Sequence, residues 1–153
     1  MGDKMKTLYL LRHAKSSWGD SELSDFDRPL NNRGLKEARE IAEHMAENEY
    51  IPELILCSTA KRTRKTLEEI LKALKFEGEA NYLESLYLAS SNTIGEAIKS
   101  VNVESLLVIG HNPGIENFLN EIINEDLIMK TSQLAVIDME SRKLVDYIRP
   151  KDF

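Results

Sequence analysis

Short apolar runs alternate with longer amphipathic segments along the chain. Continuous apolar runs of strand length occupy positions 8–11, 54–57 and 106–109, and residues 80–83 form a weaker strand candidate. Because no polar residue interrupts the three strong runs, they are typical of strands in a sheet that is covered on both faces. The pattern therefore predicts strands that are buried rather than open to solvent on one side.

Two further apolar runs lie close together near the end of the chain. They occupy positions 134–137 and 144–148, and the polar residues Glu140, Ser141 and Arg142 lie between them. Two short strand-like runs joined by a short polar connection are typical of a β-hairpin. We therefore expect these two strands to pair with each other.

Four amphipathic segments between the strands predict helices. The first begins after Asn31 or Asn32, its candidate N-caps, and runs to about Glu49 before Pro52, with apolar residues at spacings of three and four. The candidate starts of the other helices are Ser58 for the second, Ser91 or Asn92 for the third, and Asn112 as N-cap with Pro113 as first helical residue for the fourth.

Strands and helices alternate before the hairpin, which indicates an α/β fold. We expect three layers, with a mostly parallel central sheet and helices on both faces. The 153 residues have the length of one ordinary domain, so residues 1–153 are interpreted as a single domain. In such folds ligands bind at the carboxyl ends of the strands, and the residues that directly follow the strands are therefore the most informative.

Histidine and arginine side chains follow three of the predicted strands. Arg12 and His13 follow the first, Arg62 comes four residues after Ser58 behind the second, and His111 follows the run at 106–109. Arginine forks match phosphate geometry, and helix N-termini add backbone donors. A neutral imidazole is a competent nucleophile near neutral pH, while a second, protonated imidazole can donate to phosphoryl oxygens. The combination favours phosphoryl transfer, and it requires no metal ion.

These residues lie in four motifs that resemble the histidine phosphatase superfamily, and most closely its small SixA-like branch of phosphohistidine phosphatases. The four segments, in chain order, are Leu11 to Trp18 with Arg12 and His13, Asp27 to Gly34 with Arg28-Pro29-Leu30, Ser58 to Thr66 with Arg62, and Gly110-His111-Asn112-Pro113. Each motif alone is weak, but four in order with compatible spacing are specific. The resemblance covers the chain from Leu8 to about Leu119 and implies a phosphoglycerate mutase-like fold.

The resemblance also implies roles for individual residues. His13 would accept the phosphoryl group as phosphohistidine, Arg12 and Arg62 would clamp its oxygens, and His111 would stabilise it in the transition state. Water would then hydrolyse the intermediate. Ser16 and Asn112 lie within two of the motifs and are further candidates for binding the substrate. No cofactor is expected.

The sequence does not identify the general acid. Glu84 matches the stretch in which larger members of the family carry a proton-donating glutamate, but a shift of one residue would place Ser85 there instead. Asp25 and Asp27 are other nearby carboxylates. The third signature residue is Ala14, where the superfamily usually has glycine. The chain has no room for a large insertion, which implies an open, shallow site suited to a phosphoryl group carried by a protein.

Composition and charge exclude several other classes of function. Twenty basic and twenty-six acidic residues give a net charge of −6, which argues against a nucleic-acid-binding protein. No apolar run approaches the roughly 18 residues that span a membrane. The single cysteine, Cys57, allows no intrachain disulfide and favours a reducing compartment, so a cytoplasmic protein is expected.

Two other phosphatase chemistries fit the residues poorly. A cysteine phosphatase loop would require arginine six positions after Cys57, and that position is Thr63. The chain has no pair of histidines with metal-ligand spacing, which disfavours a metallohydrolase. The third histidine, His44, is expected to be a solvated surface residue of the first helix.

The sequence therefore predicts a metal-independent phosphatase that acts through a phosphohistidine on His13. By resemblance, the leading substrate is phosphohistidine on a protein. A small phosphorylated metabolite hydrolysed by the same mechanism, and a non-catalytic module that only binds phosphate, are the alternatives. Mutase activity is not favoured, because no inserted segment is available to hold an intermediate. The sequence leaves open whether Trp18 packs beside the site or marks a partner surface.

Overall fold

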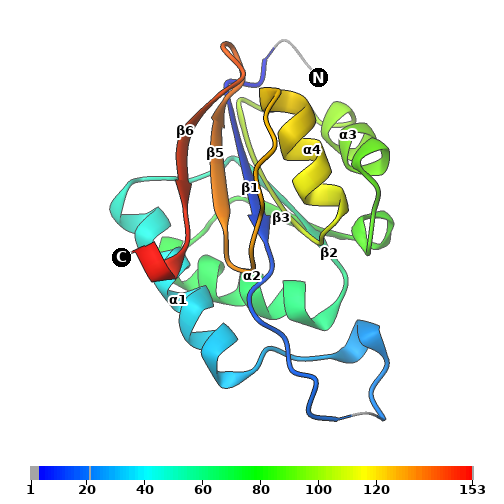
Figure 1. Cartoon of the computed structure of the whole chain (residues 1–153). Helices are drawn as coiled ribbons and strands as arrows, with labels where there is room; N and C mark the ends of the chain where they lie inside the picture. The colour runs from blue at the N-terminus through cyan, green and yellow to red at the C-terminus, as the bar shows by residue number, and fades with distance from the viewer. Residues whose placement is uncertain (1–3, 21, 153) are drawn as a thin grey trace.

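The computed structural model describes residues 4–20 and 22–152, and these form a six-stranded sheet with helices on both faces (Figure 1). The strands are β1 (Thr7–Arg12), β2 (Leu54–Ser58), β3 (Glu79–Leu83), β4 (Ser105–Gly110), β5 (Leu134–Asp138) and β6 (Lys143–Ile148). The α-helices are α1 (Asn32–Glu47), α2 (Lys61–Leu74), α3 (Ser91–Lys99) and α4 (Gly114–Ile123). Three short 3-10 helices, η1 (Asp25–Asp27), η2 (Glu84–Leu86) and η3 (Pro150–Asp152), complete the described elements.

The strands are ordered β3-β2-β4-β1-β5-β6 across the sheet. The pairs β3–β2, β2–β4 and β4–β1 are parallel, and β5 runs antiparallel to both β1 and β6. The mostly parallel sheet and the terminal hairpin are thus confirmed. Because β1, β2 and β4 are neighbours and parallel, their carboxyl ends meet at one edge of the sheet, where ligands bind in folds of this type.

Two apolar clusters cover the faces of the sheet. One combines alternate strand residues such as Leu10 and Val108 with the inner sides of α3 and α4, and the other combines their neighbours such as Leu11 and Ile109 with α1 and α2. All four of these strand side chains are fully buried. Since both faces are covered, the central strands need no polar alternation, which explains the continuous apolar runs in the sequence.

The caps of three helices differ from the sequence predictions. Asn31 caps α1 as expected, with its Oδ1 accepting from the Gly34 amide at 2.7 Å. The cap of α3, however, is Ser90 rather than Ser91 or Asn92, because the Ser90 hydroxyl accepts the bond from the Thr93 amide.

Ser58 and Asn112 do not cap α2 and α4, because their side chains make other contacts. The Ser58 hydroxyl is bonded to His111, and Ala60 takes the capping position without a side-chain bond. The Asn112 amide donates to the carbonyl oxygen of Met129, and the helix begins only at Gly114, after a cis Asn112–Pro113 peptide bond.

His44 is not a solvated residue, contrary to the prediction. Its side chain is half-buried, and its Nε2 lies 3.3 Å from the Asp146 carboxylate on β6. The same carboxylate accepts a hydrogen bond from Tyr50 at 3.0 Å. The polar side of α1 is therefore partly covered by contacts with β6. In the described part of the chain, no helix is both long and apolar enough to cross a membrane.

Two glycines allow close backbone contacts beside the carboxyl edge of the sheet. A Cβ atom on Gly34 would lie 2.0 Å from the carbonyl oxygen of Lys15, and one on Gly114 would lie 1.8 Å from that of Ala89. No side chain fits at either position without a shift of the backbone. The first turns of α1 and α4 thus fix the segments that follow β1 and η2.

The substitution Gly114→Ala should lower the free energy of unfolding by about 1–3 kcal/mol, since the methyl group overlaps a backbone oxygen. The matched control is Gly95→Ala inside α3, where the new Cβ meets only the edge of Phe118 at 3.4 Å. That change should leave the protein equally stable, or more stable by about 0.5–1 kcal/mol, because alanine favours helix. Urea denaturation of both variants measures the difference. Equal effects of the two substitutions would contradict the close contact.

Candidate active site

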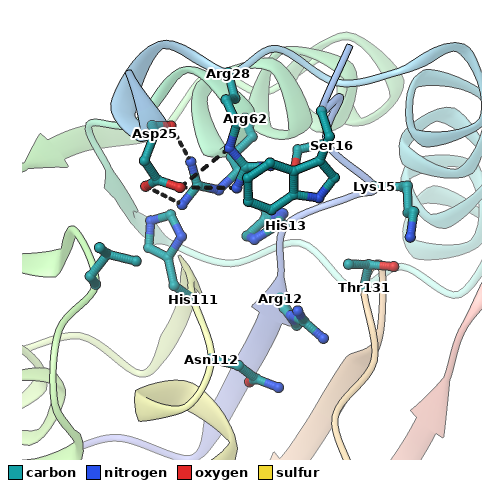
Figure 2. Close-up of a pocket in the computed structure, with 12 residues that line it drawn as sticks. Arg12, His13, Lys15, Ser16, Asp25, Arg28, Arg62, His111, Asn112 and Thr131 are labelled. Carbon is teal, nitrogen blue, oxygen red and sulfur yellow. Dashed lines mark hydrogen bonds and ion pairs between the residues drawn. The ribbon is translucent and has the colours of Figure 1, made fainter. Parts of the chain in front are cut away.

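A polar cavity of about 250 Å³ lies at the carboxyl edge of the sheet (Figure 2). The residues that line it are Arg12, His13, Lys15, Ser16, Trp18, Asp25, Arg28, Arg62, Leu88, His111, Asn112 and Thr131. They come from the ends of β1 and β4, from the first turn of α2, and from the connections near η1, η2 and β5. Four arginine or lysine side chains and one carboxylate line the cavity, which therefore favours an anionic ligand.

His13 lies at the base of this site, directly after β1. Its side chain is buried, and its Nδ1 lies 2.7 Å from the carbonyl oxygen of Ala14. A carbonyl oxygen only accepts hydrogen bonds, so Nδ1 must carry the proton and Nε2 keeps its lone pair. Burial lowers the pKa of His13 to about 3, with the positive charges of Arg62 and Arg12 adding to the effect. His13 is thus a neutral imidazole with Nε2 available as a nucleophile.

His111 lies beside His13, with the two ring centroids 5.2 Å apart. Its Nε2 is 2.8 Å from the Ser58 hydroxyl oxygen, while its buried Nδ1 has no partner among the described residues. Burial and the charge of Arg62 lower the pKa of His111 to about 4. In the protein alone His111 is therefore neutral, because the neighbouring cations disfavour a further positive charge.

Two hydrogen bonds join Arg62 to Asp25. The buried Arg62 guanidinium donates from Nη1 to the Asp25 carbonyl oxygen at 2.7 Å and from Nη2 to the Asp25 carboxylate at 3.0 Å. The same carboxylate accepts from Arg28 and from the Tyr87 hydroxyl. Burial raises the pKa of Asp25, but the hydrogen bonds from Tyr87, Arg62 and Arg28 outweigh it and lower the pKa to about 2. Asp25 is thus an ionised counterion at neutral pH.

Several buried polar atoms around the cavity have no partner in the described structure. They include Nε of both Arg12 and Arg62, along with Nδ1 of His111 and Oδ1 of Asn112. Buried polar groups are normally paired, and an unpaired one costs about 1–3 kcal/mol. Guanidinium nitrogens left without partners beside a cationic cavity fit a bound oxyanion, such as a phosphoryl group.

The structure brings together six of the seven residues predicted for the site. The six that line the cavity are Arg12, His13, Ser16, Arg62, His111 and Asn112. Glu84 does not line it and lies exposed in η2. Of the other candidate acids, Asp27 is exposed and bonded to Ser24, whereas Asp25 reaches the cavity.

Ser16 and Asn112 contact the protein rather than an open position. The Ser16 hydroxyl accepts a hydrogen bond from Arg28 at 2.8 Å, and the Asn112 amide donates to the Met129 carbonyl oxygen. The Met129 carbonyl also accepts from Arg12 at 3.1 Å. These two residues therefore hold the arginines and their surroundings in place.

No role was assigned from the sequence to Arg28, Lys15 or Thr131, which line the cavity. The supporting contacts of Tyr87 with Asp25 and of Ser58 with His111 were not predicted either. Arg28 stood within a quoted motif and next to the candidate acids, so its position was a usable signal. Lys15 and Thr131 lie on the side of the cavity away from Asp25 (Figure 2), and no pattern in the sequence links them.

Comparisons with known proteins find similar sequences and a similar structure. The sequence profile of the histidine phosphatase superfamily (branch 1) matches residues 8–86. The chain is 32% identical over 143 residues to an uncharacterised chloroplastic protein of Arabidopsis thaliana, covering 86% of this chain and 66% of that protein. It is 27% identical over 144 residues to the phosphohistidine phosphatase SixA of Escherichia coli, covering 87% and 85% of the two chains.

A solved structure from Agrobacterium tumefaciens, named as a candidate phosphohistidine phosphatase SixA, has the same architecture. It superposes with a TM-score of 0.88 at 38% identity and covers 94% of this chain and 97% of its own. The chain spans slightly less than two thirds of the length of the Arabidopsis relative. This chain and the Agrobacterium tumefaciens structure thus share one fold along nearly their whole length.

The protonation state of His13 can be measured directly. Nuclear magnetic resonance of the ¹⁵N-labelled imidazoles should show His13 neutral, with the proton on Nδ1, down to at least pH 5, because its pKa is lowered to about 3. The spectrum of His13→Ala identifies the signal. A His13 imidazole that titrates near 6.5, or that carries its proton on Nε2, would contradict the geometry.

Proposed function

The chain belongs to the histidine phosphatase superfamily, and from this we propose that it is a phosphatase that carries the phosphoryl group on His13. The observation that supports this best is the neutral His13 imidazole, whose Nδ1 is held by the Ala14 carbonyl and whose Nε2 is left available. A nucleophile with a free lone pair beside two guanidinium groups is what phosphoryl transfer requires.

In the first step, His13 Nε2 attacks the phosphorus of the substrate. A new P–Nε2 bond forms while the bond from phosphorus to the leaving group breaks, and the leaving group departs with that electron pair. The Nδ1–H···O=C bond to Ala14 stabilises the positive charge that develops on the ring. It also holds the ring in one orientation, so that attack needs no rearrangement.

The cations of the site stabilise the phosphoryl oxygens during this step. Arg62 and Arg12 each keep a buried Nε without a partner, and His111 lies beside the nucleophile. The negative charge of the phosphoryl group would raise the pKa of His111, so this imidazole gains a proton-donating role only when substrate is bound. In the second step, water attacks phosphorus, and the P–Nε2 bond breaks with its electron pair returning to Nε2. The attacking water loses a proton to the surrounding solvent, and inorganic phosphate is released.

The carboxylate of the cavity supports a particular class of substrate. Asp25 is ionised and fully engaged with Arg28, Arg62 and Tyr87, so it is poorly placed to protonate a leaving group. Glu84 is exposed and lies outside the cavity. A phosphohistidine whose other ring nitrogen is protonated can leave as neutral imidazole, whereas an alkyl ester needs a proton donor. We therefore propose phosphohistidine as the substrate group, in agreement with what the Escherichia coli relative is named for.

The substitution His13→Ala should abolish phosphate release from a phosphohistidine peptide, because it removes the nucleophile. Arg62→Ala should lower kcat by about 100- to 1000-fold, the usual cost of losing one preorganised charge-stabilising donor. The measurement is phosphate release in excess EDTA, with Arg64→Ala, an exposed residue of the same helix, as the matched control. Turnover by His13→Ala at the normal rate would refute the mechanism. Tight binding of the peptide without release by the wild type would indicate a phosphate-binding module.

A further inference from the structure

Two exposed apolar side chains stand at the mouth of the cavity, and neither is used in the chemistry above. Trp18 is 76% exposed and Leu88 is 54% exposed, yet both line the cavity. They come from different segments, Trp18 from the connection between β1 and α1 and Leu88 from that between η2 and α3. Exposed large apolar groups that converge on a site mark a contact with a partner or ligand.

The backbone at Leu88 is strained in a way that exposes this side chain. Leu88 has a φ of 49°, a left-handed conformation that costs a branched residue roughly 1–2 kcal/mol. The residues on both sides are anchored: Leu86 and Ala89 are buried, and the Ala89 carbonyl lies against Gly114. Strain that is imposed by the surrounding structure is typical of functional positions.

Trp18 is held equally firmly although it is exposed. The Arg28 guanidinium stacks on its ring, with Cζ 3.4 Å from the ring centroid, and the Arg28 side chain is itself fixed by Ser16 and Asp25. The preceding residue, Ser17, donates its amide to the Pro29 carbonyl at 2.8 Å. A rigid tryptophan loses little conformational entropy on contact, which is why this residue is frequent where binding energy is concentrated.

The cavity is too small to hold a large substrate. Its volume of about 250 Å³ lies below the roughly 300–1,000 Å³ of pockets that enclose whole small molecules. A phosphoryl group and the ring that carries it can enter, whereas the rest of the substrate must stay outside. That outer part then lies against Trp18 and Leu88, because both stand at the mouth through which it passes.

We infer that Trp18 and Leu88 form a docking surface for a protein that carries the phosphohistidine, with apolar side chains next to the modified residue. This inference rests on the proposed function and adds the part of the substrate that the enzyme recognises. Both side chains act in substrate binding and touch none of the reacting atoms. They therefore discriminate a phosphohistidine on a protein surface from the free phosphorylated amino acid.

The test compares one protein substrate with one small substrate. The probes are a protein domain phosphorylated on a surface histidine with phosphoramidate, and free phosphohistidine. Trp18→Ala and Leu88→Asn should each lower kcat/KM for the protein at least about tenfold, mainly through KM. On the free amino acid the loss should be at least about fivefold smaller than on the protein, because only the protein extends beyond the cavity onto these two side chains. Val145→Ala, which removes an equally exposed apolar side chain on β6, should change neither value.

Leu88→Asn separates recognition from stability. Asparagine tolerates the left-handed conformation better than leucine, so the melting temperature should be unchanged or higher while the apolar contact is lost. Loss of activity toward the protein substrate then has no explanation in unfolding. Equal losses on both substrates, or none on either, would overturn the inference. A changed oligomeric state with unchanged affinity would assign the surface to self-association instead, and would also overturn it.

A binding measurement distinguishes this inference from the proposed function. In a His13→Ala background, calorimetry should show that the phosphorylated domain binds at least about tenfold more weakly when Trp18 or Leu88 is also changed. If the wild type binds with this dependence but releases no phosphate, the proposed function fails and the docking surface stands. If the phosphorylated domain does not bind at all, the docking surface is refuted.

Discussion

The parallel pairing of β1 with β4 determines the geometry of the site. In this register Arg12 and Gly110, the last residues of the two strands, lie opposite each other. The residue that follows each strand is a histidine, and the centroids of the two rings are 5.2 Å apart. The pairing of β2 with β4 then places the carboxyl end of β2, and with it the start of α2, at the same edge. A shift of one residue between β1 and β4 would separate His13 from His111 and turn the buried side chains of β1 to the other face.

The close approach of three arginines at one site needs a counterion, and Asp25 provides it. Its carboxylate is shared between Arg28 and Arg62, two of the cavity's cations, and the Tyr87 hydroxyl completes its set of partners. This arrangement keeps Arg62 in place before substrate arrives. Burial and the positive charges of the arginines lower the pKa of both histidines and keep them neutral, although the Asp25 charge acts in the opposite direction on His111. The same carboxylate is thereby unsuited to donate a proton. This links the electrostatics of the site to the proposed leaving group, which needs no proton donor.

The sequence predicted the layers, the parallel sheet and most of the cavity lining, because these depend on local patterns and on residues that directly follow strands. It did not predict what depends on contacts between distant segments. Ser58 was expected to cap a helix and is instead bonded to His111, 53 residues away. Asp25 was one carboxylate among several until the fold placed it between Arg28 and Arg62. Leu88 lies in a stretch with several leucines, and nothing in the sequence marks its left-handed backbone or its exposure. Both depend on the contact between Ala89 and Gly114, which belong to distant segments.

The proposed mechanism requires a phosphoryl group bonded covalently to Nε2 of His13. Trapping this intermediate tests the mechanism most directly. The enzyme would be mixed with an excess of phosphohistidine peptide, quenched in alkali within milliseconds, digested, and analysed by mass spectrometry. A phosphoramidate that is stable in alkali and labile in acid, on the peptide that contains His13 and bonded through Nε2, is the predicted result. A phosphoryl group on another residue, or phosphate release with no covalent intermediate during turnover, would contradict it.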